Sequence, residues 1–181
     1  MYLLFAKKGD VIYLNKYIMS HIHTRSGQID FVVNIYVVYD NKVLLRLHEK
    51  HHKWLTPGGH VELNETPEVA AVREVQEEVG LAVTLWSGNK APLTGALPME
   101  KYQELIPPYY MNIHKINDEH RHITLGYFAK AEISVIKEPK THEKSGGCRW
   151  LTKDEVSAAA DIDEATKIYC LKALELLGDH S

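Results

Sequence analysis

The sequence predicts one domain of the α+β or α/β class, in which helices pack against a sheet. Three observations predict it. Residues 31–39 are β-branched and aromatic, as in a buried strand. Residues 67–79 carry the start and stop signals of a helix, and residues 164–177 repeat apolar side chains at helical spacing. The length of 181 residues fits one domain.

The elements before the central helix form a hairpin with an N-terminal extension. Apolar residues at helical spacing predict a short amphipathic helix over residues 11–22, and we assign residues 1–30 to an extension of the same domain. Asp40-Asn41 predicts a turn after the strand at 31–39, and the alternation over residues 42–48 predicts the returning strand. We expect Thr56-Pro57-Gly58-Gly59 to form a loop.

The elements after the central helix are strands followed by two helices. Residues 88–117 show no clear period. The predicted strands are residues 82–86, 122–134 and 149–151. The predicted helices are residues 153–160 and 164–177, the second with Ile168, Leu171, Leu174 and Leu177 along one face.

The composition is that of an ordinary globular protein. Hydrophobic residues make up 45% and charged residues 25%, which excludes disordered and collagen-like classes. No apolar run approaches the roughly 18–20 residues that span a bilayer, and the start lacks the features of a signal peptide. Because the chain has only two cysteines, Cys148 and Cys170, we expect a protein of the reducing cytoplasm. Because it has no long apolar run, we expect it to bind no membrane.

The charge balance restricts the class of ligand. The net charge of −3 gives no basis for binding long nucleic acids through their backbone phosphates. A small phosphate-bearing ligand would therefore need metal ions or a local basic patch at its site.

The central helix carries two contrasting faces. Thr66 is a good N-cap, Pro67 occupies the first helical position, and Gly80 predicts a left-handed stop. At 100° per residue, one face collects Val69, Val72, Val75 and Val79, which we expect to pack on the sheet. The opposite face collects Glu74, Glu77 and Glu78 within an arc of about 100°.

These carboxylates suit a divalent cation. Like charges at such spacing cost a few tenths of a kcal/mol per pair, so an acidic surface is the simplest alternative. Gly58-Gly59, ahead of the helix, lets the backbone approach a ligand closely. Because Mg²⁺ prefers carboxylate, carbonyl and phosphate oxygens together, the pattern favours a metal site.

The segment GGHVELNETPEVAAVREVQEEVGL resembles the Nudix box, the signature of hydrolases that act on nucleoside diphosphates linked to another moiety. The family pattern is Gly, five residues, Glu, seven residues, then Arg-Glu-aliphatic-any-Glu-Glu-any-Gly-aliphatic. The sequence supplies each of these from Gly59 to Leu81, with a chance probability on the order of 10⁻⁹. The resemblance implies a Nudix fold over residues 31–181: an α/β/α sandwich with a mixed sheet between helices.

The resemblance also implies roles for individual residues. The glutamates matching Glu74, Glu77 and Glu78 ligate Mg²⁺ or Mn²⁺ in the family, usually with a backbone carbonyl of the glycine pair, here Gly58 or Gly59. The residues matching Arg73 and Glu65 form an ion pair that holds loop and helix together. Glu77 and Glu78 are the candidates for the general base within the motif.

Other side chains are candidates outside the motif. Some relatives use a glutamate from a loop before a late strand, which Glu143 would match, although a solvated loop charge is the alternative. His120 and His122 point to the same side of a strand and would contact substrate, with surface histidines as the alternative. No third zinc ligand stands at a recognisable spacing from them. Further candidates for substrate contact are Arg46, Lys53 and His60, with an ordinary polar hairpin as the alternative for the basic residues.

The predicted function is Mg²⁺-dependent hydrolysis of a diphosphate bond in a small nucleotide-type substrate. A nucleoside triphosphate pyrophosphohydrolase is the default, and an ADP-ribose or nucleotide-sugar pyrophosphatase is the alternative. Isopentenyl diphosphate isomerases share the fold but rely on a cysteine near the motif, and no cysteine precedes Cys148. A binding module that has lost hydrolysis is the other alternative, but such proteins usually have a broken Nudix box, whereas this one is intact. A homodimer is compatible with all of these.

Overall fold

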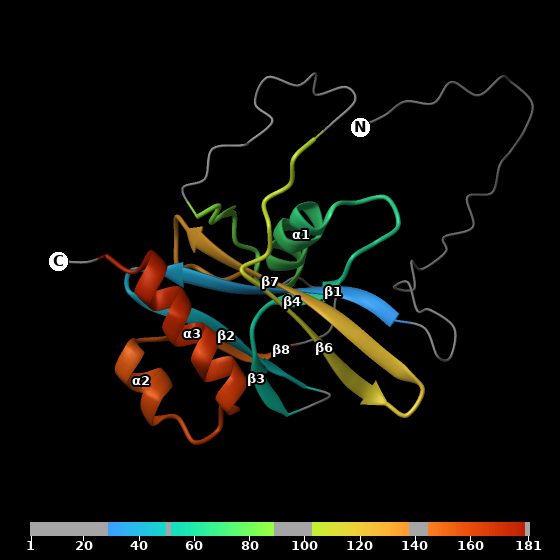
Figure 1. Cartoon of the computed structure of the whole chain (residues 1–181). Coiled ribbons are helices and arrows are strands. Elements are labelled where there is room, and N and C mark those ends of the chain that lie inside the picture. The colour runs from blue at the N-terminus through green and yellow to red at the C-terminus, as the bar shows by residue number, and fades with distance from the viewer. Residues whose placement is uncertain (1–28, 50–51, 89–102, 138–144, 180–181) are drawn as a thin grey trace, which may run out of the picture.

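The computed structural model describes residues 29–49, 52–88, 103–137 and 145–179 (Figure 1). The helix predicted over residues 11–22, most of the extension assigned to residues 1–30, and Glu143 therefore lie outside the described residues.

The described residues build a mixed, eight-stranded sheet around its first strand. Strand β1 (Ile29–Tyr39) pairs antiparallel with β2 (Lys42–His48) and β4 (Gly58–His60), and parallel with β7 (His120–Ala131). β7 also pairs with β5 (Val83–Leu85) and β6 (Tyr110–Asn117), and β2 also pairs with β3 (Lys53–Leu55) and β8 (Ser145–Leu151).

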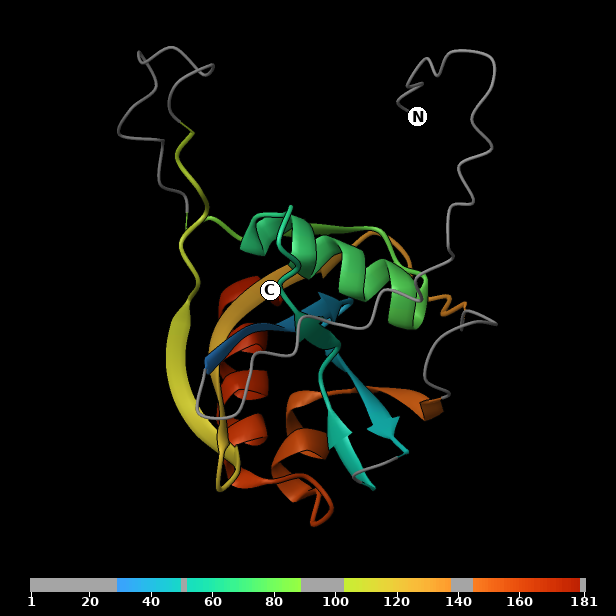
Figure 2. The ribbon, with the colours of Figure 1, turned by 90° about the vertical axis from the view of Figure 1, so that its right-hand side faces the viewer.

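Helices cover both faces of this sheet. Helix α1 (Pro67–Val79) lies across one face, and α2 (Lys153–Ala158) and α3 (Glu164–Leu177) lie against the other (Figure 2). The alternation of β1 explains the two cores, because Val33, Ile35 and Val37 join the cluster under α1 while Tyr36 and Val38 join the cluster under α2 and α3. The predicted α/β/α sandwich with a mixed sheet is confirmed.

Local signals fix the ends of these elements. The Thr66 side chain accepts a hydrogen bond from the Val69 N–H, and Gly80 ends α1 with a φ of 68°. Asp40 and Asn41 have φ values of 46° and 57°, the left-handed pair that joins two strands by a tight hairpin. α1 and α3 begin and end where the sequence predicts them.

Several segments differ from prediction. Strand β7 covers residues 120–131 and not 122–134, β8 covers residues 145–151 and not 149–151, and α2 ends at residue 158 and not 160. Residues 58–60 are not a loop but the short strand β4, held by pairing with β1. Residues 110–117, which lack a clear period, form β6 on the outer side of β7. Several β6 side chains are exposed, so this strand never develops the alternation that marks a half-buried strand.

Helix α1 is also rotated relative to the prediction. Val69 and Val72 are 54% and 40% exposed, so they do not pack on the sheet. The buried residues of α1 are Ala70, Ala71, Glu74, Val75 and Val79. The small alanine pair packs in the core beside Val75, and this orientation turns Glu74 inward. In α3, likewise, Ile168 is exposed and Cys170 is buried in its place.

A candidate active site between β4 and helix α1

The glycine pair of β4 lies directly against the carboxylates of α1. A Cβ atom at Gly59 would stand 2.3 Å from Glu74 Oε1, and one at Gly58 would stand 2.2 Å from the Val33 carbonyl oxygen. At Gly58 the backbone of β1 excludes any side chain, and at Gly59 a side chain would displace the Glu74 carboxylate. Because glycine has no side chain, the backbone of β4 at Gly58 and Gly59 can lie directly against the buried edge of α1.

The pairing of β4 fixes the direction of its backbone groups. Ile35 N–H donates to the Pro57 carbonyl and Val61 N–H to the Phe31 carbonyl, so the backbone N–H and C=O groups of alternate residues in this segment point toward β1. The backbone groups of the intervening residues point toward α1. The Gly58 N–H donates to Glu78 Oε2 at 3.0 Å, and the His60 carbonyl accepts from Arg73 Nη2 at 2.9 Å.

Arg73 joins the loop to the helix. Its Nη2 and Nε atoms contact Glu65 at 2.6 and 3.0 Å, and its Nη1 contacts Glu74 at 2.7 Å and Glu77 at 2.9 Å. Burial alone would raise the pKa of Glu65, but hydrogen bonds from Arg73 and the Glu62 N–H outweigh it and lower that pKa. The hydrogen bond to Glu65 also raises the pKa of Arg73. Both groups are therefore charged at neutral pH.

A second arginine, Arg46 of β2, forms an ion pair with Glu78. Arg46 is buried, so its guanidinium lies against the carboxylate cluster and not in solvent. The side chains of Glu74, Glu77 and Glu78 are 7%, 36% and 13% exposed. Glu77 is thus the carboxylate of the three that solvent reaches most easily.

The site therefore gathers oxygen ligands at one place. Glu74 and Glu78 lie against the backbone of β4, Glu77 lies beside them on α1, and two arginines balance the repulsion of the three carboxylates. A hard divalent cation prefers such a donor set, and with its own charge it could take over the neutralisation that the arginines provide. The arrangement can bind a cation and hold a carboxylate beside a water molecule.

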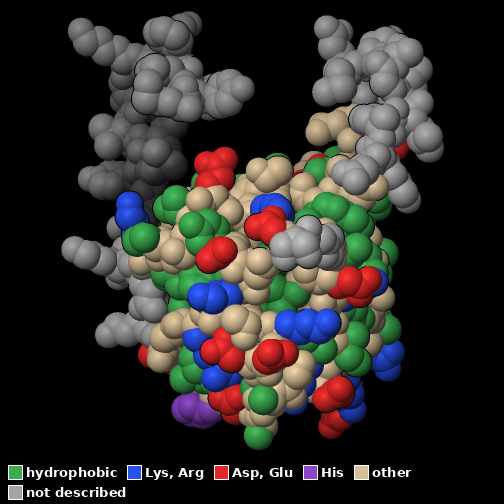
Figure 3. All heavy atoms as spheres, turned by 90° about the vertical axis from the view of Figure 1, so that its left-hand side faces the viewer, with side chains coloured by type: hydrophobic (Ala, Val, Ile, Leu, Met, Phe, Trp, Pro, Cys, Tyr) green, Lys and Arg blue, Asp and Glu red, His purple; other side chains and the backbone are tan. Residues whose placement is uncertain are grey.

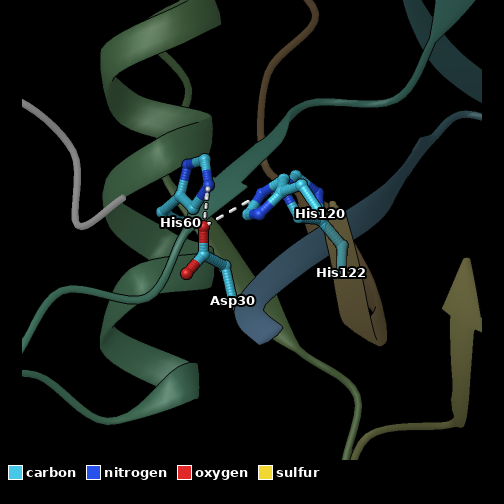
Figure 4. Close-up of side chains that lie close together, drawn as sticks. All are labelled: Asp30, His60, His120 and His122. Atoms are coloured by element: carbon cyan, nitrogen blue, oxygen red, sulfur yellow. Dashed lines mark hydrogen bonds and ion pairs between the residues drawn. The ribbon is translucent and has the colours of Figure 1, made fainter. Parts of the chain in front are cut away.

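The remaining candidates separate into two places. Lys53 is exposed on β3, and the register pairs Leu55 with Arg46, which puts Lys53 on the same sheet face as Arg46. His60, His120 and His122 gather elsewhere, around Asp30 of β1 (Figure 4). Burial, together with the other histidines, lowers the pKa of His122 to about 4, so its imidazole is neutral at pH 7.

Sequence reasoning did not find Asp30 or the grouping of three histidines. His60 stands in the glycine segment and Asp30 ahead of the apolar run of β1, far from His120 in the sequence. Only the strand pairing brings them together. The one available signal was an acidic residue, Asp30, near the start of a mostly apolar strand.

The comparisons with known proteins agree with this geometry. A model of the NUDIX domain matches residues 30–172. The chain belongs to the Nudix family. It is 30% identical over 149 residues to a MutT-like protein of Streptomyces ambofaciens, which covers 82% of this chain and 79% of that protein. It is 38% identical over 96 residues to an 8-oxo-dGTP diphosphatase of Proteus vulgaris, over 53% of this chain and 62% of that protein.

The solved structures support the same assignment. A Nudix-family hydrolase from Clostridium perfringens superposes with a TM-score of 0.74 at 33% identity, covering 82% of this chain and 97% of that one. A MutT Nudix hydrolase from Burkholderia pseudomallei has a TM-score of 0.56 at 21% identity and shares the fold. The Nudix assignment from the motif is therefore confirmed, and with it the class of enzyme, a hydrolase.

The surface of this Nudix protein is mixed in charge where it can be seen. Acidic and basic side chains are interspersed on the face drawn in Figure 3. Among the described residues, no helix is both long and apolar enough to cross a bilayer.

Proposed function

We propose that this Nudix protein hydrolyses a diphosphate bond in a small nucleotide, with Mg²⁺ or Mn²⁺ held by Glu74, Glu77 and Glu78. The observation that carries the proposal is the contact of Glu74 and Glu78 with the glycine backbone of β4, where a Cβ at Gly59 would collide with the Glu74 carboxylate. An acidic surface would not need a glycine at that point.

The donor set fits the metal. All the side-chain donors are carboxylate oxygens, as a hard cation prefers. The backbone groups of Gly58 point toward α1, as those of His60 do, because the Gly58 N–H donates to Glu78 and the His60 carbonyl accepts from Arg73. The carbonyl of Gly58 is therefore better placed than that of Gly59 to complete the ligand set.

The metal supplies charge neutralisation on phosphate oxygens and a water of lowered pKa. The chain supplies the rest. Glu77, the most exposed of the three carboxylates, takes the proton from the attacking water, whereas Glu78 is held by Arg46 and Gly58. Arg73 positions Glu74 and Glu77, and Glu65 positions Arg73.

The substrate class rests on electrostatics and on the relatives. Lys53, which shares a sheet face with Arg46, is our candidate for contact with a substrate phosphate. The similarity to an 8-oxo-dGTP diphosphatase favours a nucleoside triphosphate, cleaved to the monophosphate and pyrophosphate. We place this activity in the cytoplasm. The predicted role of Glu143 as a further ligand or base remains a prediction.

The test is a substrate panel. The full chain would be incubated with Mg²⁺ and nucleoside triphosphates including 8-oxo-dGTP, ADP-ribose and nucleotide sugars, and the products resolved by chromatography and ³¹P NMR. We expect a monophosphate and pyrophosphate from a triphosphate, and no turnover in chelator. Preferential cleavage of ADP-ribose would favour the alternative substrate class. Tight nucleotide binding without cleavage of any compound would contradict the proposal and indicate a binding module.

Self-association is a separate part of the proposal. Phe31 of β1 and Ile113 of β6 both pair with Ile123 of β7, so they share one sheet face, and both are half exposed. Burying such apolar area would favour a homodimer. Sedimentation velocity would report a dimer mass if this holds and a monomer mass if it does not.

A further inference from the structure

Four side chains converge on the sheet face opposite α1. In the parallel pairing of β1 with β7, Asp30 stands opposite His122, and in the antiparallel pairing of β1 with β4, Val32 stands opposite His60. Directly paired residues share a face, and so do residues two positions apart on one strand. Asp30, His60, His120 and His122 therefore project to the same side (Figure 4).

The spacing of their donor atoms suits a single tetrahedral ion. The four ligand atoms lie within 4.8 Å of one another. His120 Nε2 is 2.9 Å from His122 Nε2 and 3.1 Å from Asp30 Oδ2, which is 3.6 Å from His60 Nε2. A tetrahedral ion with metal–ligand distances of about 2.0–2.1 Å has ligand–ligand edges of about 3.3 Å, close to these separations.

The rings are already arranged around a common point. His122 lies edge-on to His60, with centroids 5.1 Å apart, and to His120, with centroids 4.8 Å apart. Asp30 is 3% exposed and is fixed by the ladder of β1, so its carboxylate is part of the fold and not a mobile surface charge. Little rearrangement would be needed for the four groups to bind one ion.

The chemistry of this set differs from that of the Nudix carboxylates. Three imidazole nitrogens and one carboxylate suit Zn²⁺, whereas Mg²⁺ requires oxygen ligands. The two sites are also on opposite faces, since Gly59 meets Glu74 on the α1 face and His60 follows it on the other.

We propose that Asp30, His60, His120 and His122 form a Zn²⁺ site separate from the catalytic centre. With four protein ligands it is a closed, structural site. The ion ties β1, β4 and β7 together beside the glycine pair, and the carbonyl of His60 is at the same time held by Arg73. Zinc at this place stabilises the segment that carries Gly58 and Gly59. This inference does not depend on the proposed hydrolysis.

The test is a Zn²⁺ titration of metal-free full-length protein by calorimetry, in a large excess of Mg²⁺ to saturate the carboxylate site. We expect one equivalent of Zn²⁺ to bind. His120→Ala and Asp30→Asn should each weaken that affinity by about 100-fold or more, since even outer-shell partners contribute 10–100-fold. Glu77→Gln should leave it unchanged, which separates the two sites.

His114→Gln is the matched control. His114 is exposed and pairs directly with His122 across β6 and β7, but it is not one of the four ligands. It should bind Zn²⁺ like the wild type. Co²⁺ in place of Zn²⁺ should give the intense visible absorption of a tetrahedral centre in the wild type and in His114→Gln, and lose it in His120→Ala.

Folding is monitored separately, by circular dichroism and thermal melting of each variant. Zn²⁺ should raise the melting temperature of the wild type and of Glu77→Gln, because it binds the native state, and should not raise that of His120→Ala. His122→Asn replaces His120→Ala if the latter is unfolded. The proposal is overturned if excess Mg²⁺ abolishes Zn²⁺ binding, or if folded His120→Ala or His122→Asn binds Zn²⁺ as tightly as the wild type.

Discussion

Truncating Val75, but not Val72, should destabilise the protein, because Val75 is buried in the core whereas Val72 lies at the exposed margin of the same helix. Val75 is fully buried in the cluster with Val33 and Val79, whereas Val72 is 40% exposed. Val75→Ala removes two buried carbons, worth about 0.8 kcal/mol each, and leaves a small cavity. Together these predict a loss of about 2–3 kcal/mol in the free energy of unfolding.

Val72→Ala is the matched control, since the same atoms are removed from the same helix. It should change the free energy of unfolding by less than about 0.5 kcal/mol, because little burial is lost and alanine is the better helix former.

Urea denaturation followed by circular dichroism measures both variants, and Val75→Ala should also melt about 4–12 °C lower. An equal or larger loss in Val72→Ala would refute the orientation of α1 and remove Glu74 from the site.

Three further changes test the site and the core. Gly59→Ala should lower turnover at least about tenfold and abolish the Mg²⁺-induced rise in melting temperature, because its Cβ would stand 2.3 Å from Glu74 Oε1; normal kinetics would contradict the close contact. Arg73→Ala should cost about 1–3 kcal/mol in urea melts by leaving part-buried carboxylates without their cation, and a wild-type midpoint would show that the network is dispensable. Burial raises the pKa of Cys170 to about 12, above about 8.5 in an unfolded chain, so its contribution to stability is complete below pH 8.5 and is lost as pH rises toward 12. Urea melts at pH 7 and pH 10 in reductant should therefore lose less stability with pH in Cys170→Ala than in the wild type, and equal losses would argue against a buried thiol.

Much of the fold could be predicted from local signals. The N-cap Thr66 and the left-handed Gly80 are short-range features, and they gave the bounds of α1 correctly. The Asp40-Asn41 turn did the same for the first hairpin. The ion pair of Arg73 with Glu65, implied by the Nudix motif, is present in the structure.

What could not be predicted depends on tertiary packing. The hydrophobicity of Val72 suggested burial, but the small Ala70 and Ala71 are what allow α1 to approach the sheet, and they set its rotation. Residues 58–60 form the strand β4 because they pair with β1, a tertiary contact that the local sequence does not reveal. Asp30 and His120 share no sequence pattern, and their meeting follows from the parallel register of β1 and β7.

The turnover of Glu77→Gln on the best substrate of the panel, measured in saturating Mg²⁺, tests the central claim most directly. Glutamine keeps the shape of the side chain but can neither bind the cation as a carboxylate nor accept the proton of water. We predict a fall in kcat of about 100-fold or more, with the urea midpoint close to that of the wild type. Wild-type turnover by the folded variant would contradict the assignment and place the chemistry away from α1.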